Sequence, residues 1–123
     1  MSLPSSDVSN QGSFVTVIDH QVALSRVGGD VQLLKEIAQL FIEDYPKAME
    51  EIRQAAHRGD AKFLERTAHG LKGSVANFGA PAAVEAARTL EAMGRAEQLA
   101  EVQQVIQSLE LALAALRPEL ESL

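Results

Sequence analysis

Apolar residues recur at helical spacing over almost the whole chain after residue 13, and this pattern limits the possible folds more than any other feature. In the longest such stretch they fall three or four residues apart, which is the period of a helix with one buried side. They are Leu33, Leu34, Ile37, Leu40, Phe41, Tyr45, Met49 and Ile52. We therefore expect an all-α protein.

Helix-capping and helix-ending residues divide the chain into five predicted helices. Asp19, Asp30 and Asp60 stand where an N-cap is needed. Gly94 is expected to end the fourth helix. Pro118 is expected to end the fifth, with continuation through the final residues as the alternative. The predicted ranges are 19–27, 30–58, 60–79, 80–94 and about 97–118. Because a proline removes one hydrogen bond of the helix, Pro46 should kink the second helix, or else divide it in two.

The domain organisation follows from these segments. Residues 1–13 are rich in Ser, Asn, Gln and Gly, so we expect a disordered N-terminal segment. The apolar stretch 14–18 is expected to pack as an extended arm. Four long helices with short connections then form an antiparallel four-helix bundle, with the short helix 19–27 added at the N-terminal side. The folded domain is predicted to span 14–123.

Composition narrows the class of function. The net charge of −6 argues against nucleic-acid binding, which requires a basic surface. The chain has no cysteine, so thiolate chemistry and disulfides are excluded. No apolar run is long enough to span a membrane and no signal peptide is recognisable, so a cytoplasmic protein is expected. His20 and His57 lack metal-ligand spacing, so no metal site is predicted.

His69 differs from the other two histidines in the direction in which its side chain is expected to point from its helix. At about 100° per residue, it lies about 140° from the centre of the apolar side of its helix. The helical position therefore disfavours a core histidine. It leaves two interpretations, an ordinary surface histidine and a reactive one.

The neighbours of His69 favour the reactive interpretation. Gly70 and Gly73 each cost about 0.8–1 kcal/mol inside a helix, which suggests a geometrical reason for them. Gly73, one turn further on, removes a side chain that would crowd the imidazole, and Ala76 is also small. Lys72 lies close enough to place an ammonium group beside a phosphate. An exposed imidazole is largely neutral and nucleophilic near pH 7.

The stretch 68–80, AHGLKGSVANFGA, resembles the signature of histidine-containing phosphotransfer (HPt) domains. The core of that signature is His-x-(Leu/Ile)-Lys-Gly-(Ser/Ala). The resemblance extends upstream to the stretch 41–46, FIEDYP, and downstream to Leu90 and Glu91. It covers about residues 19–117.

The resemblance implies a role for individual residues. His69 matches the phosphorylated histidine, with Nε2 as the acceptor atom. Lys72 matches the lysine that neutralises the phosphoryl group, and Gly73 the glycine that leaves room for a partner. Glu91 falls where many relatives carry a glutamine that hydrogen-bonds the imidazole. It either accepts Nδ1–H of His69 or is a solvated surface glutamate, and Arg95 is expected to add positive charge at the same end.

The resemblance also implies a function. The chain would exchange a phosphoryl group between His69 and an aspartate of a response-regulator receiver domain, with a hybrid histidine kinase as a further partner. The receiver would supply Mg²⁺, and the chain would be a carrier without ATP-dependent kinase activity. Two alternatives are an adaptor that binds a receiver without phosphotransfer and an excised histidine domain of a chemotaxis-type kinase.

The surface for that partner is expected around His69. Ala76 and Ala80 are the candidate contact residues. Val22 and Leu24 are further candidates, although bundle packing is the favoured interpretation for both.

Overall fold

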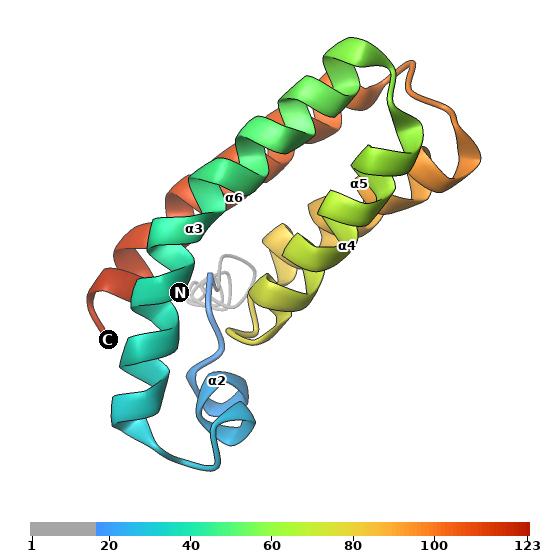
Figure 1. Ribbon diagram of the computed structural model, residues 1–123. Coiled ribbons are helices and arrows are strands. Elements are labelled where there is room, and N and C mark those ends of the chain that lie inside the picture. Colours follow the sequence, from blue (N-terminus) through green and yellow to red (C-terminus); the bar gives the residue numbers. More distant parts are fainter. Residues whose placement is uncertain (1–16) are drawn as a thin grey trace, which may run out of the picture.

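The computed structural model describes residues 17–123 and shows an all-α architecture over this range (Figure 1). The short helix α2 is followed by four longer ones, which confirms the predicted fold class. The helices are α2 His20–Arg26, α3 Val31–Arg58, α4 Ala61–Ala76, α5 Pro81–Ala96 and α6 Val102–Glu121. The predictions for residues 1–13 and for residues 14–16 of the arm lie outside the described residues.

Three aspartates begin three of the helices, as their positions predict. The Asp19 side chain accepts hydrogen bonds from the first backbone N–H groups of α2. Asp30 accepts from Leu33 N at 3.0 Å, and Asp60 from Phe63 N at 3.1 Å. Each bond satisfies an N–H group that has no partner inside the helix.

The two prolines inside helices do not end them. α3 is one helix through Pro46, so the alternative of two separate helices is wrong. α6 continues past Pro118 to Glu121, so of the two possibilities for this end the continued helix is correct. Each proline lacks one N–H and so leaves a single carbonyl one turn earlier without its helical partner, while the other hydrogen bonds of the helix continue past it.

The connection between α5 and α6 differs from the prediction. α5 continues through Gly94 to Ala96, and α6 begins at Val102 rather than near Glu97. Glu97 instead has a φ of 57°, the left-handed conformation that commonly follows the end of a helix. The apolar period cannot distinguish this turn from a helical start, because Leu99 and Val102 fit both.

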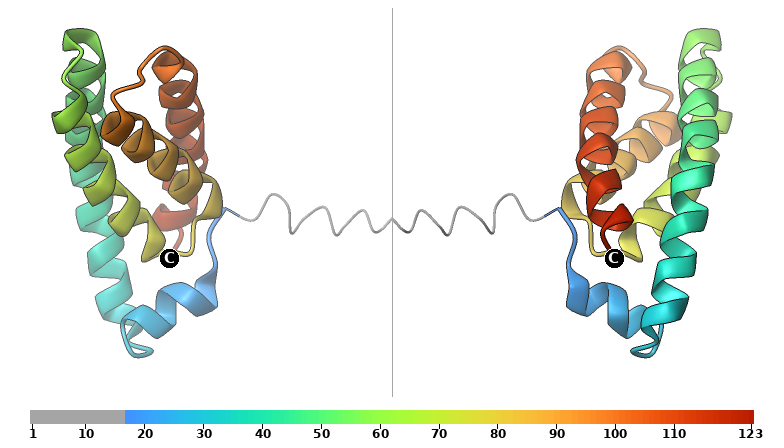
Figure 2. Two further views of the ribbon diagram at one scale, coloured as in Figure 1. Left: turned by 90° about the vertical axis from the view of Figure 1, so that its right-hand side faces the viewer. Right: turned by 90° about the vertical axis from the view of Figure 1, so that its left-hand side faces the viewer.

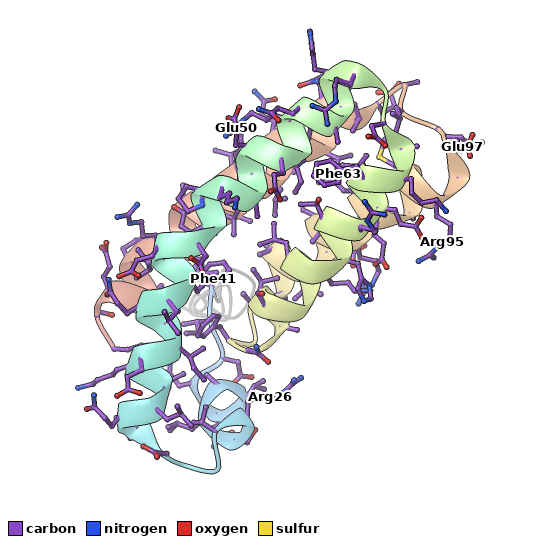
Figure 3. The ribbon with its side chains drawn as sticks, viewed as in Figure 1. Arg26, Phe41, Glu50, Phe63, Arg95 and Glu97 are labelled. Atoms are coloured by element: carbon purple, nitrogen blue, oxygen red, sulfur yellow. The ribbon has the colours of Figure 1, made fainter. Side chains whose placement is uncertain are left out.

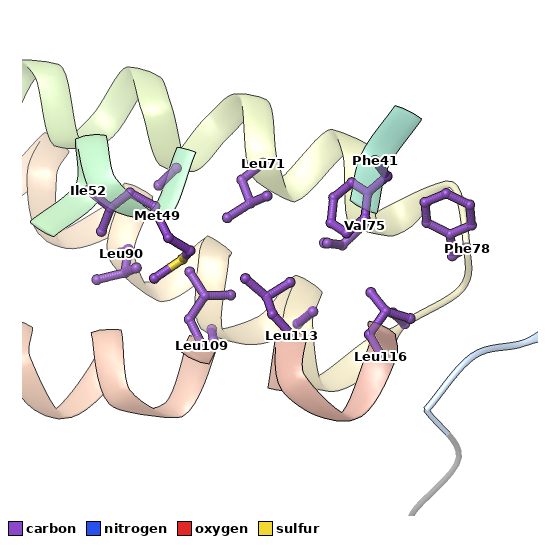
Figure 4. Packing of buried hydrophobic residues seen from close by; sticks show 14 of the residues in the cluster. Phe41, Met49, Ile52, Leu71, Val75, Phe78, Leu90, Leu109, Leu113 and Leu116 are labelled. Carbon is purple, nitrogen blue, oxygen red and sulfur yellow. The ribbon is translucent and has the colours of Figure 1, made fainter. Parts of the chain in front are cut away.

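The four long helices run antiparallel, and each connection is short. α3 and α6 lie side by side, α4 and α5 form the other half of the bundle, and α2 lies across one end (Figures 1 and 2). α4 and α5 make the most extensive contact of any pair of helices. Aliphatic side chains and the rings of Phe41 and Phe78 fill the space between the two halves (Figure 4). None of the helices in the described part of the chain has the length and apolar character needed to cross a membrane.

The segment before α2 closes one end of the bundle. Ile18 is buried, and Asp19 N donates to Phe78 O at 3.0 Å in the α4–α5 turn. Val22 of α2 also lies against Gly79, with its Cβ 3.1 Å from the position of a Cβ built on that glycine. Gly79 has a φ of +59°, and a Cβ at this position would lie 2.6 Å from the Cβ of Asp19. A glycine is therefore needed here both for the turn and for the close approach.

Candidate functional site

His69 lies in the middle of α4 and points away from the bundle core. The opposite side of the helix is formed by Leu64, Ala68, Leu71 and Val75, all of which are buried. The His69 side chain is 68% exposed, which confirms the direction predicted from the helical period.

Glu91 of α5 faces His69 and is the one buried charged residue among those described. Its Oε2 lies 2.7 Å from His69 Nδ1, while only 7% of its side chain is exposed. Of the two interpretations that the sequence allowed, a contact with the imidazole is therefore correct. A solvated surface glutamate is not.

Two cations share the carboxylate of Glu91 with His69. Lys72 Nζ donates to Glu91 Oε1 at 2.7 Å. Arg95 Nη2 donates to Glu91 Oε2 at 3.1 Å, while its Nε donates to Glu65. Figure 3 shows Arg95 on the outer side of the α4–α5 pair, away from α3. Residues from two helices thus form one network around a buried carboxylate.

The surroundings of Glu91 keep it ionised. The hydrogen bond from Lys72 lowers the pKa of the Glu91 carboxyl below its usual value, and the contact with His69 lowers it further. Burial acts in the opposite direction and is outweighed. His69 therefore has a carboxylate, not a carboxylic acid, beside its Nδ1.

The contact with Glu91 determines which nitrogen of the His69 imidazole carries the proton. An ionised carboxylate only accepts hydrogen bonds, so the hydrogen between it and Nδ1 belongs to the ring. The neutral ring of His69 then carries its proton on Nδ1 and leaves the lone pair on Nε2. With most of the side chain exposed, Nε2 is the nitrogen available to an incoming molecule.

Gly94 determines how closely the two helices of the site approach each other. A Cβ at Gly94 would lie 2.7 Å from both Ala61 O and Glu65 N of α4. The prediction that Gly94 ends its helix is therefore wrong, and the glycine serves close helix packing instead. Its position one turn after Leu90, on the side of α5 that faces α4, was the available signal in the sequence.

The comparisons with known proteins agree with this geometry. The family model described as Hpt domain matches residues 36–119. The chain belongs to the Hpt domain family. Membership of this family supports a histidine phosphotransfer role in phosphorelays, and proteins of the family are phosphocarriers rather than kinases.

A solved structure shares the fold of this Hpt domain. It is the crystal structure of histidine-containing phosphotransfer protein B (HptB) from Pseudomonas aeruginosa PAO1, with 24% sequence identity and a TM-score of 0.81. The match covers 88% of this chain and 94% of that chain. The comparison with curated proteins gave no match.

Gly73 lies beside open space in this Hpt domain. A Cβ at Gly73 or at Gly70 would meet no atom within 4 Å. A Cβ alone at Gly73 would therefore not crowd the resting imidazole, and the predicted crowding would need a longer side chain at this position. What Gly73 provides is open space along the exposed side of α4, one turn from His69.

The remaining candidates for partner contact differ in their exposure. Ala76 is partly exposed, whereas Ala80 is buried and only 2% exposed. Ala80 is therefore a core residue, and its prediction as a surface contact is wrong. Ala80 follows the turn that ends with Gly79, and this turn leads the chain back towards the core. The apolar period of the helices did not reveal that change of direction. Val22 and Leu24 are partly buried, as expected from bundle packing.

An open hollow borders His69 on the side of the α4 N-terminus. Its lining consists of His69 together with charged residues of α4 and α5, namely Lys62, Glu65, Arg66, Glu91 and Arg95. Lys62 and Arg66 form no ion pair with any of the described residues. Around the exposed imidazole the surface is therefore locally basic, in contrast to the acidic chain as a whole. In residues 17–123, no three His, Asp or Glu side chains gather as metal ligands would.

Proposed function

We propose that Nε2 of His69 accepts a phosphoryl group from the aspartyl phosphate of a receiver domain and returns it to such an aspartate. The observation that carries this proposal is the 2.7 Å contact between Nδ1 of an exposed His69 and the ionised Glu91. It leaves Nε2 as the unprotonated and accessible nitrogen in a member of the Hpt domain family.

In the forward step, the Nε2 lone pair attacks phosphorus in line with the bond to the aspartyl oxygen. That P–O bond breaks, and its electron pair remains on the aspartate. The product ring carries phosphorus on Nε2 and hydrogen on Nδ1. The reverse step returns the phosphoryl group to aspartate, so this chain needs only to position the ring and to neutralise charge.

Lys72 and Arg95 are the cations placed to support this transfer. Both hydrogen-bond Glu91 in the resting structure, and the side chains are 27% and 63% exposed. Each side chain is flexible enough to turn from the carboxylate towards a phosphoryl group on the neighbouring ring. The Mg²⁺ that phosphoryl transfer requires is proposed to be bound by the receiver, and a hybrid histidine kinase is proposed as the source of phosphate.

A phosphotransfer assay tests this function. Receiver domains of the source organism are labelled with radioactive acetyl phosphate and mixed with wild type, His69→Gln or His57→Gln. His57 is an exposed histidine at the end of α3, so its variant is the matched control. We expect a receiver to lose label to wild type and to His57→Gln, but not to His69→Gln.

Two results contradict the proposal. One is equal labelling of His69→Gln and wild type, which removes His69 as the acceptor. The other is a receiver that binds wild type without any transfer of label, which indicates the alternative of an adaptor.

A further inference from the structure

Glu91 contacts the ring nitrogen that phosphorylation leaves free. The phosphoryl group would be attached to Nε2, whereas Glu91 Oε2 lies at Nδ1, on the other side of the ring. The Glu91 side chain is only 7% exposed, so its packing between α4 and α5 fixes its position without help from His69. The contact with Nδ1 can therefore persist in the phosphorylated domain.

The other charged groups near His69 do not replace this contact. From α4, Lys62, Glu65, Arg66 and Lys72 face the region of the ring, and from α5 Glu91 and Arg95 do so. Glu65 accepts a hydrogen bond from Arg95, and the lysine and arginine side chains are donors only, so they cannot accept one from Nδ1–H. Glu91 is the group among them that contacts the imidazole.

The Nδ1 proton decides whether the phosphorylated ring is a good donor. When an aspartate oxygen attacks phosphorus, the P–N bond breaks and its electron pair returns to Nε2. If Nδ1 carries a proton, the product is neutral imidazole and no proton has to move. If Nδ1 has lost its proton, the leaving group is an imidazolate anion, which must first be protonated.

We propose that Glu91 holds the Nδ1 proton on phosphorylated His69, so that the domain remains a competent phosphoryl donor at a pH where free phosphohistidine has lost that proton. This inference rests on the proposed function, because it concerns the phosphorylated state of the same histidine. Glu91 is in this sense a positioning residue, since it acts on the reacting phosphorus only through the ring.

A glutamine, which the resemblance leads one to expect at this position, would hold the proton less strongly. Its amide oxygen accepts a hydrogen bond from Nδ1–H but carries no full negative charge. At a separation of 2.7 Å and with little exposure to water, the difference of one charge is large. We expect it to change the proton affinity of the phosphorylated ring by at least about tenfold, or about one pH unit.

The test follows the phosphorylated ring through a pH titration. The full chain is phosphorylated with phosphoramidate, and the phosphorus and imidazole nitrogen resonances are recorded from about pH 6 to pH 10. The variant is Glu91→Gln, and the matched control is Glu85→Gln, which removes the same charge from an exposed position of α5 that contacts Arg88. We expect wild type and the control to titrate together, and Glu91→Gln to titrate at least about one pH unit lower.

Transfer to a receiver provides a second readout. As the pH rises from about 6.5 to about 8.5, the rate constant for transfer from Glu91→Gln should fall earlier than that of wild type. Coincident titrations of the phosphorylated wild type and Glu91→Gln would overturn the inference while leaving the proposed function intact. Failure of His69 to become phosphorylated by either phosphoramidate or a receiver would overturn both.

The wild-type protein alone gives a test that does not depend on the folding of a variant. Its phosphorylated His69 is compared with Nε2-phosphorylated N-acetylhistidine in the same buffer. The inference requires the protein to lose the Nδ1 proton at a higher pH than the small molecule. An equal or lower value would contradict it.

Discussion

At the scale of single residues, Glu91 gives this site its individual character. A buried carboxylate is costly unless charged partners surround it, and Lys72, Arg95 and His69 all contact this one. The same carboxylate orients the imidazole and holds the two cations near it. Stability and reactivity therefore depend on the same side chain.

The pH dependence of stability follows from the lowered pKa of Glu91. A carboxyl group whose pKa is lower in the folded state stabilises the fold above its unfolded value of 4.5. This contribution is lost as the pH falls through the folded value. Glu91→Gln should therefore be less stable than wild type at pH 7 by about 1 kcal/mol, below the ~1.5–3 kcal/mol of a full charged hydrogen bond because glutamine retains an acceptor oxygen.

Urea unfolding of both proteins at pH 7 and well below pH 4.5 checks this prediction. The difference in the free energy of unfolding should shrink in acid, and Glu85→Gln serves as the control for net charge. A difference that is unchanged or larger in acid would show that Glu91 is not ionised in the fold.

At the scale of helices, the glycines of α4 leave space open on the surface, whereas a glycine of α5 allows two helices to pack closely. Gly70 and Gly73 of α4 face open space, whereas Gly94 of α5 allows the backbone of α4 to approach. The first two weaken their own helix, and Gly73 keeps the surface beside His69 clear. The third strengthens the contact between the two helices that carry the site.

Replacement of glycine by alanine should therefore have opposite effects on stability at Gly73 and at Gly94. Gly73→Ala should raise the free energy of unfolding by about 0.5–1 kcal/mol, because alanine favours the helix and meets no atom. Gly94→Ala should lower it by about 1–3 kcal/mol, because its Cβ would overlap backbone atoms of α4. Chemical denaturation measures both, and equal signs would contradict this account.

The rate of phosphotransfer distinguishes the effect of Gly73 on stability from its effect on a partner's access to His69. If open space at Gly73 admits the partner, Gly73→Ala should slow transfer from a receiver although it stabilises the free domain. Gly70→Ala is the matched control, since Gly70 borders the groove between α3 and α4. It should show a similar gain in stability with an unchanged transfer rate.

At the scale of the whole molecule, one end of the bundle is closed by contacts between segments distant in the sequence. The residues before α2 reach the α4–α5 turn, where Asp19 N donates to Phe78 O and Gly79 lies against Asp19. This closure fixes the position of α2 and the start of α5, on which Glu91 is carried.

Replacement of Gly79 should loosen that closure. Gly79→Ala combines a left-handed backbone with a Cβ that would lie 2.6 Å from another Cβ, so we expect a loss of about 2–5 kcal/mol. Gly28→Ala is the control, because Gly28 has a similar φ of +64° but open space around it. It should cost about 1–2 kcal/mol, from backbone strain alone. Thermal or urea unfolding compares the two, and equal losses would show that the contact with Asp19 contributes nothing.

The sequence by itself determined the helices, their aspartate caps and the outward direction of His69. These features are local, because hydrogen bonding within a helix and the period of its apolar side depend on residues a few positions apart. The prediction failed at Gly94, Glu97 and Ala80 and left two possibilities at Pro118, because local preferences at these positions allow more than one conformation. There the packing of other segments decides between them.

Only the tertiary structure decided which groups meet at the site. Glu91 is 22 residues from His69, and its spacing alone allowed either a contact with the imidazole or a position in solvent. The close approach of α4 and α5 at Gly94 buries its carboxylate and places Lys72, Arg95 and the imidazole around it. A buried charge must find partners, so the distance between two helices fixed both its contacts and the nitrogen that His69 presents.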